Sequence, residues 1–172
     1  MTDGRLTVAA VDAMTAAQFV DAFAGIAEHS AWVAEAAEPA RPYGTREAMI
    51  DAFTEAVTAA SPERQLDLLN AHPDLAGRAA IAGEIGDDSR SEQADAGLDR
   101  LTEDEFARFT ELNTAYRNRF GFPFILAVKG ATKHDILSAF EARIGNSRDR
   151  ELETAIEQVC RIIRFRLEGR VA

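Results

Sequence analysis

Apolar residues recur at spacings of three and four along most of this chain, and this periodicity constrains its fold more than any other feature. The clearest stripe is aliphatic throughout and lies near the end of the sequence: Leu152, Ile156, Val159, Ile163 and Leu167. Several runs begin with the capping-box pattern, a Ser or Thr followed three residues later by Gln or Glu: Thr15–Gln18, Ser89–Glu92 and Thr102–Glu105. A chain patterned in this way buries its apolar residues as packed helices.

The other boundaries are also those of a helical protein. Further helix starts are indicated at Thr45, Ser61 and Thr132. Residues 122–128 are the one segment that competes as a strand, and a lone strand has no partner with which to form a sheet. We therefore predict an all-α protein in which residues 1–172 form a single compact domain of seven or eight helices, with residues 1–14 as a loose N-terminal segment.

The chain is acidic, with 19 Lys and Arg residues against 29 Asp and Glu residues and a net charge of −10. Binding to nucleic acid or to an anionic membrane needs a cationic surface, so the charge argues against both kinds of partner. A local cationic pocket for an anionic small molecule remains compatible with this composition.

Cysteine usage and the apolar runs indicate the cellular compartment. Cys160 is the single cysteine, so the chain can build neither an internal disulfide nor a cysteine-based zinc site. The longest apolar run, residues 122–128, is far shorter than the ~20 residues that span a bilayer. The first residues lack the basic flank and apolar core of a signal peptide. We expect a cytoplasmic protein.

His72 has a setting that suggests chemistry. Pro73 disfavours a helical conformation at the residue before it, so His72 should lie at or just past the end of the helix that begins at Ser61. A rigid proline beside the ring helps to hold an imidazole, which titrates near neutral pH, in a fixed direction. A histidine favourably placed at a helix C-terminus explains the same pattern without catalysis, and the residues alone favour that explanation.

Glu92 and Arg166 are each open to two interpretations. Glu92 is the third helical residue of the capping box that Ser89 begins, which accounts for it without a functional role. Arg166 lies three residues beyond Ile163, beside the predicted buried face of the last helix. An arginine in that place has to pair with an anion or extend its charged end into solvent.

Five short motifs follow one another between His72 and Ile125. They are His72-Pro73-Asp74-Leu75-Ala76-Gly77-Arg78, Ser89-x-x-Glu92-Gln93, Leu98-Asp99-Arg100-Leu101, Leu112-Asn113-x-x-Tyr116 and Arg119-Phe120-Gly121-Phe122-Pro123-Phe124-Ile125. In this order they resemble the OHCU decarboxylases, which act on 2-oxo-4-hydroxy-4-carboxy-5-ureidoimidazoline (OHCU) between urate and allantoin. The resemblance runs from about Thr15 to Leu167. Asp95 and Tyr43 depart from the residues expected in the family, glycine and phenylalanine, at positions outside the predicted chemistry.

The resemblance implies an all-helical fold, usually homodimeric, that binds a small-molecule substrate and needs no cofactor and no metal. It implies that His72 and Glu92 are catalytic. It also implies a substrate site formed by the following residues: Arg166, Pro73, Ser89, Gln93, Phe124, Ile125 and Val128.

The implied reaction needs proton transfer and orientation. Loss of carbon dioxide leaves an electron pair that the neighbouring C=N unit of the substrate accepts, so no added electron sink is required. The hydroxyl loses its proton to become the ketone of allantoin, and the adjacent carbon gains a proton on one face, which sets the S configuration. We expect His72 to be the proton shuttle, Glu92 its orienting partner and a hydrogen-bond acceptor, and Arg166 the anchor for the substrate.

Two other classes of protein compete with this interpretation. A non-catalytic helical interaction module would expose an apolar helix face and would have no concave site at which His72, Glu92 and Arg166 converge. A metal enzyme would use His72, Asp74 and Glu92 as ligands, although one well-placed histidine is few for a zinc site.

Overall fold

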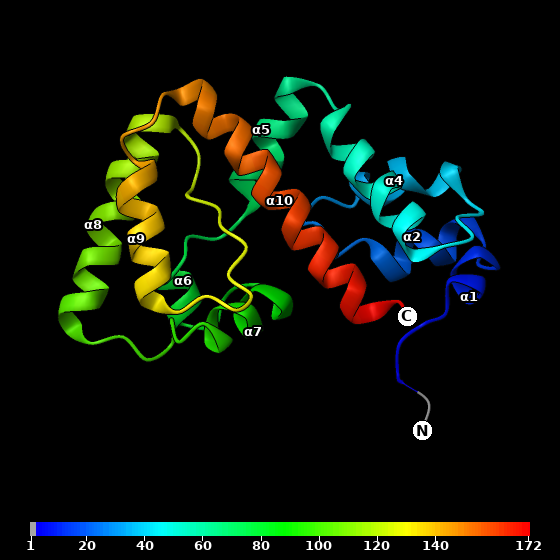
Figure 1. Cartoon of the computed structure of the whole chain (residues 1–172), viewed down its shortest axis with the longest axis horizontal. Helices are drawn as coiled ribbons and strands as arrows, with labels where there is room; N and C mark the ends of the chain where they lie inside the picture. The colour runs from blue at the N-terminus through cyan, green and yellow to red at the C-terminus, as the bar shows by residue number, and fades with distance from the viewer. Residues whose placement is uncertain (1–2) are drawn as a thin grey trace. The chain divides into compact units, whose positions relative to one another are not determined.

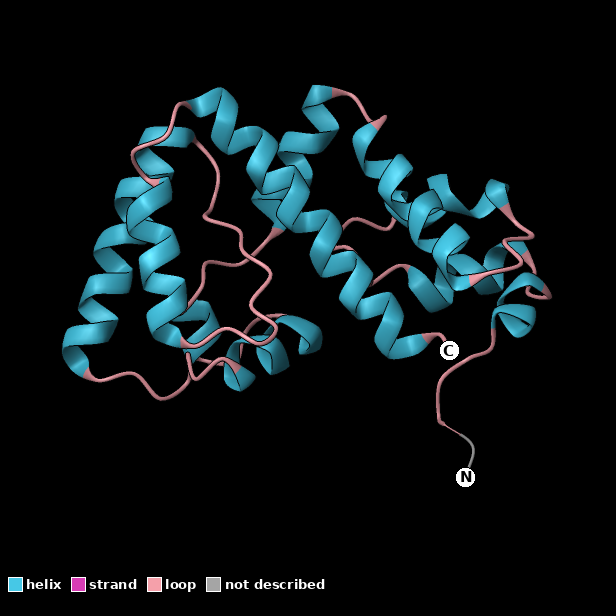
Figure 2. Ribbon diagram, viewed as in Figure 1, coloured by secondary structure: helices cyan, strands magenta, loops and turns pink. Residues whose placement is uncertain are grey.

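The computed structural model describes residues 3–172, and within this range the chain is all-α, as predicted (Figures 1 and 2). The structure is 65% helical, and residues 3–172 contain no strand beyond an isolated bridge between Leu6 and Val171. Ten α-helices occur in this range, more than the seven or eight predicted. The excess comes from three helices of four to six residues, too short for a periodic signal: α1 (Val8–Asp12), α3 (Trp32–Ala37) and α6 (Arg78–Ile81).

The chain divides into two units. The first comprises Met1–Ala71 and Val159–Ala172, and the second comprises His72–Gln158. Besides α1 and α3, the first unit contains α2 (Ala16–Phe23), the short 3-10 helix η1 (Glu38–Ala40), α4 (Arg46–Thr58) and α5 (Pro62–Ala71). Besides α6, the second contains α7 (Asp87–Asp95), α8 (Glu103–Phe120) and α9 (Lys133–Arg143). The long helix α10 (Arg148–Arg170) contributes residues to both units.

Aromatic rings form the core of the first unit. The ring centroid of Phe19, on α2, lies 5.0, 6.0 and 6.1 Å from those of Phe23, Tyr43 and Phe53. Phe19, Phe23 and Phe53 are at most 1% exposed. The predicted capping box at Thr15 is present and starts α2, so the first amphipathic run is confirmed.

The N-terminal segment is held more firmly than predicted. Val11 on α1 is fully buried, and the Asp12 carboxylate accepts the backbone N–H groups of Tyr43 and Gly44 at 2.8 and 3.0 Å. The expectation of a loose segment over residues 1–14 is therefore wrong for residues 8–12, while residues 1–2 lie outside the described part of the chain. The anchor was missed because it joins residues about thirty positions apart.

Capping residues set the helix boundaries of the second unit. Capping boxes begun by Thr102 and Thr132 start α8 and α9, and Gly121 ends α8 in the left-handed conformation with φ of 82°. The two helices lie side by side (Figure 1). These predicted boundaries are confirmed.

Five aromatic rings form the core of the second unit. Tyr116 on α8 lies at their centre, with its ring centroid 4.5 to 5.9 Å from those of the four others: Phe120, Phe122, Phe124 and Phe140. Phe122 and Phe124 belong to residues 122–128, which form neither helix nor strand. The rings therefore fix a connection that lacks regular structure in the core of the unit.

None of the helices in residues 3–172 combines the length and the apolar character needed to cross a bilayer.

Candidate active site

His72 lies directly after Ala71, the last residue of α5, as Pro73 predicted. The residue is 6% exposed. We refer to residues 72–77 as the His72 turn. Within it Ala76 has a φ of 54°, a left-handed conformation that is uncommon for a residue other than glycine.

Polar side chains from α7 and α8 hold the backbone of the His72 turn. Gln93 on α7 accepts the N–H of Ala76 at 2.9 Å and donates to the carbonyl of Asp74 at 3.3 Å. Asn113 on α8 donates to the carbonyl of Leu75 at 2.9 Å. Both amide side chains are buried, so the polar backbone of the turn is paired inside the protein. A turn held at three consecutive residues keeps the neighbouring imidazole in one place.

The start of α7 differs from the prediction. Gly86 is the N-cap residue and Asp87 the first helical one, and the N–H of Arg90 donates to the carbonyl of Gly86 at 2.9 Å. The capping box predicted to begin at Ser89 is therefore wrong. Ser89 lies inside the first turn and is 5% exposed.

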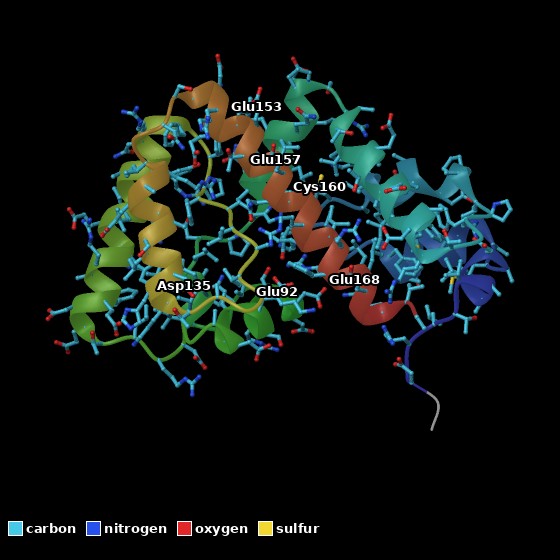
Figure 3. All side chains as sticks on the ribbon, viewed as in Figure 1. Glu92, Asp135, Glu153, Glu157, Cys160 and Glu168 are labelled. Carbon is cyan, nitrogen blue, oxygen red and sulfur yellow. The ribbon has the colours of Figure 1, made fainter. Side chains whose placement is uncertain are left out.

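This earlier start changes the interpretation of Glu92. The residue lies in the middle of α7 and is not its third helical residue, so the capping explanation for it does not hold. Glu92 is half-buried on α7 (Figure 3), next to Gln93, whose two bonds join α7 to the His72 turn. The structure thus joins the elements that carry His72 and Glu92. The role of Glu92 as the orienting partner of His72 stays a prediction.

Arg166, on the part of α10 that belongs to the first unit, pairs with a residue that the sequence analysis missed. Its Nη1 donates to the carbonyl of Ile26 at 3.0 Å, and its Nη2 donates to the carboxylate of Glu28 at 2.9 Å. Arg166 and Glu28 are 7% and 6% exposed. The expectation that an arginine beside the buried face needs an anion is confirmed, and Glu28 is one such anion. These contacts fix the direction of the guanidinium group.

The two residues that sequence reasoning missed differ in how they could have been found. Asn113 occupies a buried position of α8 between Phe109 and Tyr116, and a polar residue on an apolar stripe is a recognisable signal. Glu28 lies between α2 and α3, outside any periodic run, so no pattern marks it.

The remaining predicted contacts are in the second unit. Phe124, Ile125 and Val128 are 1%, 3% and 6% exposed, and Pro73 is half-buried. These residues lie in the unit that holds the His72 turn.

The arrangement gives no support to the metal-enzyme hypothesis. The Asp74 carboxylate, a proposed ligand, accepts a hydrogen bond from Nε of Arg117 at 2.8 Å. In the described part of the chain, no three His, Cys, Asp or Glu side chains are grouped so that they could hold a metal ion.

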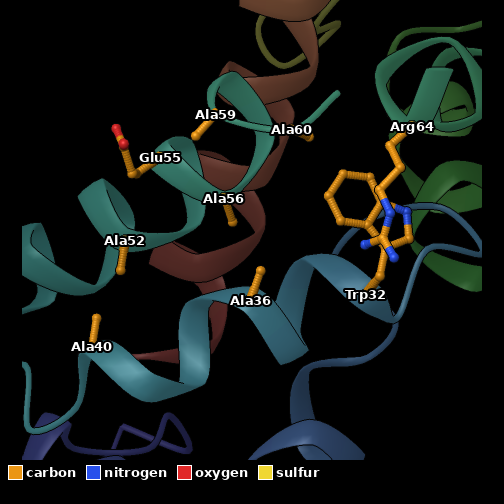
Figure 4. A pocket seen from close by; sticks show the side chains of 9 residues that line it. All are labelled: Trp32, Ala36, Ala40, Ala52, Glu55, Ala56, Ala59, Ala60 and Arg64. Atoms are coloured by element: carbon orange, nitrogen blue, oxygen red, sulfur yellow. The ribbon is translucent and has the colours of Figure 1, made fainter. Parts of the chain in front are cut away.

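Two cavities are lined by other residues. One, of about 360 Å³, lies in the first unit, where alanine side chains form most of the wall (Figure 4). Trp32 and Arg64 lie together at one end, with the Arg64 guanidinium 5.2 Å from the indole centroid. The other, of about 350 Å³, lies in the second unit between residues 95–100 and residues 131–134. No predicted site residue lines either cavity.

The family model that matches this chain and two of its relatives carry the same description. The family model described as OHCU decarboxylase matches residues 12–168. The 2-oxo-4-hydroxy-4-carboxy-5-ureidoimidazoline decarboxylase of Haloferax volcanii is 44% identical over 166 residues, which cover 96% of each chain. The protein of the same name from Halalkalicoccus jeotgali is 42% identical, over 95% of this chain and 91% of that protein.

A solved structure adds a similarity of fold. The crystal structure of (S)-allantoin synthase matches with a TM-score of 0.78 and 34% identity, over 97% of this chain. The present chain spans about half of that one, 54%.

The packing of the His72 turn can be tested at Gly77. An added Cβ at Gly77 would lie 2.9 Å from the Cβ of Asp74, so the turn has to shift to admit it. We expect Gly77→Ala to lower the free energy of unfolding by about 1–3 kcal/mol, the usual cost of overpacking. Urea denaturation measures this. Gly25→Ala is the control, because its added Cβ meets nothing within 4 Å. Equal stability of the two variants would contradict the tight packing.

The buried ion pair can be tested at Glu28. We expect Glu28→Ala to lower the free energy of unfolding by about 3–5 kcal/mol, because it removes the carboxylate from a buried arginine. The matched control is Glu141→Ala, which breaks the exposed pair with Arg108 and should cost at most about 1 kcal/mol. Chemical denaturation compares the two, and a loss for Glu28→Ala as small as that of the control would refute the argument.

Proposed function

Because this chain belongs to the OHCU decarboxylase family, we propose that it removes the carboxyl group of OHCU and yields (S)-allantoin in urate degradation. The observation that carries this proposal is the match of residues 12–168 to the family model, together with 44% identity to a decarboxylase over 96% of both chains. A relative matched over nearly its whole length supports the transfer of its activity to this chain.

The chemistry requires little beyond positioned protein groups. The C–C bond to the carboxylate breaks, carbon dioxide leaves, and the C=N unit of the ring accepts the electron pair, so that its nitrogen takes up one proton from the solvent. The hydroxyl proton leaves as the ketone forms, and the neighbouring carbon is protonated on one face. The protein therefore has to supply a group that both takes and gives protons, and contacts that fix the ring relative to it.

In this proposal His72 transfers the protons, Glu92 orients its ring and Arg166 binds a carboxylate or carbonyl oxygen of the substrate. The first assignment is supported by the burial of His72 and by the hydrogen bonds of Gln93 and Asn113, which fix the backbone beside the imidazole. Glu92 is supported by its place in the middle of α7, where capping does not explain it. Arg166 is supported by its pairing with Glu28, which directs a fork of donors suited to oxygen acceptors.

The remaining contacts complete the proposed pocket. They come from the following residues: Pro73, Ser89, Gln93, Phe124, Ile125 and Val128. Their burial or half-burial supports a site shielded from water, in which hydrogen bonds to the substrate are stronger than in solvent.

We also propose that residues 1–172 act as one functional domain in a cytoplasmic homodimer that binds neither nucleic acid nor membranes. The family match from residue 12 to residue 168 runs through both units and supports one functional domain. The net charge of −10 and the single Cys160 support the choice of partners and compartment. Light scattering of the purified protein measures the subunit number, and a monomeric mass at assay concentrations would overturn the homodimer.

The activity can be tested with OHCU made in situ from urate. We expect the protein to accelerate loss of the substrate's circular-dichroism signal and to give (S)-allantoin, with no added cofactor and no effect of a chelator. His72→Asn should lower kcat by about 10²-fold or more, the scale of a lost general acid–base. Racemic allantoin at the uncatalysed rate would refute the activity and favour a helical interaction module. Loss of activity with a chelator, restored by a divalent ion, would favour a metal enzyme.

The role of Glu92 can be tested with Glu92→Gln. Because Glu92 does not cap α7, the change should alter the free energy of unfolding by less than about 1 kcal/mol. Removal of a charge beside the imidazole should lower kcat sharply, by about 10²-fold. The matched control is Glu153→Gln on an exposed position of α10 (Figure 3), which should leave both measurements unchanged. A folded Glu92→Gln variant with full activity would refute the assignment.

A further inference from the structure

Side chains, rather than a β-ladder, hold the backbone of residues 120–128. Nε of Arg148 donates to the carbonyl of Phe120 at 3.2 Å, and Nη1 of Arg143 donates to the carbonyl of Ile125 at 2.7 Å. Oε1 of Gln158 accepts the N–H of Ala127 at 3.0 Å. Arg143 ends α9, whereas Arg148 and Gln158 belong to α10, so two helices fix the last residue of α8 and the connection after it, which has no regular structure of its own.

Arg143 is itself held by a buried carboxylate. Glu151 is fully buried and accepts three hydrogen bonds, from Nε of Arg143 at 2.8 Å, the hydroxyl of Tyr116 at 2.7 Å and Nδ2 of Asn146 at 3.0 Å. Burial and the neighbouring carboxylate raise the pKa of Tyr116, so its hydroxyl stays protonated as a donor. The charge of Arg143 is thereby neutralised inside the protein.

Aromatic rings hold the guanidinium group of Arg143 from another side. Its central carbon lies 4.4 Å from the ring centroid of Phe124, within the range of a cation–π interaction. Phe124 stacks on Phe140 of α9 with centroids 3.9 Å apart and ring planes 9° apart. These contacts favour one orientation of the Arg143 guanidinium group, in which Nη1 points at the carbonyl of Ile125.

These contacts determine which backbone groups of the segment remain to bind a ligand. The carbonyl of Ile125 and the N–H of Ala127 are occupied by Arg143 and Gln158. Within residues 3–172, no acceptor is found for the N–H groups of Ile125 and Leu126. The carbonyl of Ile125 faces Arg143, and the N–H groups of Ile125 and Leu126 are left as donors. Such donors can bind an oxygen acceptor of a ligand, such as a carboxylate or a carbonyl.

Stability of the fold does not by itself explain the ion pair between Arg143 and Glu151. Apolar residues of similar volume often replace a buried ion pair without loss of stability. We therefore explain Arg143 and Glu151 by the orientation that the pair gives to the guanidinium group, and not by its contribution to the free energy of folding. A guanidinium group carries several donors aimed in different directions on one rigid plane, and Arg143 uses Nε for Glu151 and Nη1 for Ile125.

We propose that Arg143 and Gln158 are positioning residues that orient the peptide groups of residues 125–127 toward the substrate. The inference rests on the proposed function, because Phe124, Ile125 and Val128 are proposed to line the pocket. Neither side chain needs to touch the substrate. Each acts through a backbone group that it holds, Arg143 through the carbonyl of Ile125 and Gln158 through the N–H of Ala127.

The test uses two variants at Gln158, which is half-buried. Gln158→Met keeps the length of the side chain and removes the acceptor for Ala127, whereas Gln158→Glu keeps an acceptor oxygen. With OHCU made in situ, we expect Gln158→Met to raise KM about fivefold to tenfold, the effect of about one lost hydrogen bond, with kcat changed less than twofold. Gln158→Glu should restore KM to within about twofold of the wild-type value.

A matched control separates positioning from stability. Gln65→Met also removes side-chain hydrogen bonds to backbone groups, the carbonyls of Val57 and Thr58, but in the first unit. We expect its melting temperature to fall as much as that of Gln158→Met, with KM unchanged. Arg143→Lys keeps the charge beside Glu151 and loses the second donor. If it folds, its KM should rise as in Gln158→Met, and if it does not fold, the Gln158 pair decides the question.

Several outcomes would overturn the proposal. A folded Gln158→Met variant with wild-type KM would show that the orientation of residues 125–127 does not depend on Gln158. Equal loss in Gln158→Met and Gln158→Glu would show that the hydrogen bond is not the cause. An inactive wild-type protein would instead refute the proposed function, so the two failures are distinguishable.

Discussion

In the fold described for residues 3–172 no sheet offers partners to the backbone outside the helices, so side chains have to pair it. Gln93 and Asn113 do so for the His72 turn, and Arg143 and Gln158 do so for residues 120–128. Each of these side chains projects from a helix, and a helix is a stiff support. These bonds tie the non-helical segments that carry the proposed chemistry to the helices around them.

Each of the two units contains an arginine that is paired with a buried glutamate. Arg166 in the first unit and Arg143 in the second each donate to a backbone carbonyl and pair with a buried glutamate. Such pairs add little net stability, because desolvation offsets much of the attraction. We attribute their role to orientation, since a carboxylate that binds one nitrogen of a guanidinium group fixes the plane of the group and with it the direction of its other donors. In each unit, a buried glutamate thus orients an arginine whose other donors bind a backbone carbonyl.

The capping-box pattern predicted two helix starts correctly and failed at the third, near Ser89. The boxes at Thr15 and Thr102 start helices as predicted, and both reciprocal hydrogen bonds of each box are formed. Near Ser89 the pattern was equally good, but Gly86 caps the helix instead and the acids Asp87 and Asp88 occupy its first turn, where the helix dipole favours them. The earlier start places Ser89, which is 5% exposed, inside the first turn of α7.

The helical class, most helix boundaries and the position of His72 after α5 could be read from the residues, because each depends on interactions within about one helical turn. The five motifs between His72 and Ile125 also indicated the family, because their identity and order can be recognised without knowing which residues are in contact. The partners of the site residues could not be read in this way. Glu28 and Arg166 are 138 positions apart, Asn113 and Leu75 are 38 apart, and Gln158 and Ala127 are 31 apart. Contacts of this kind arise from the packing of helices against one another, which no local pattern encodes.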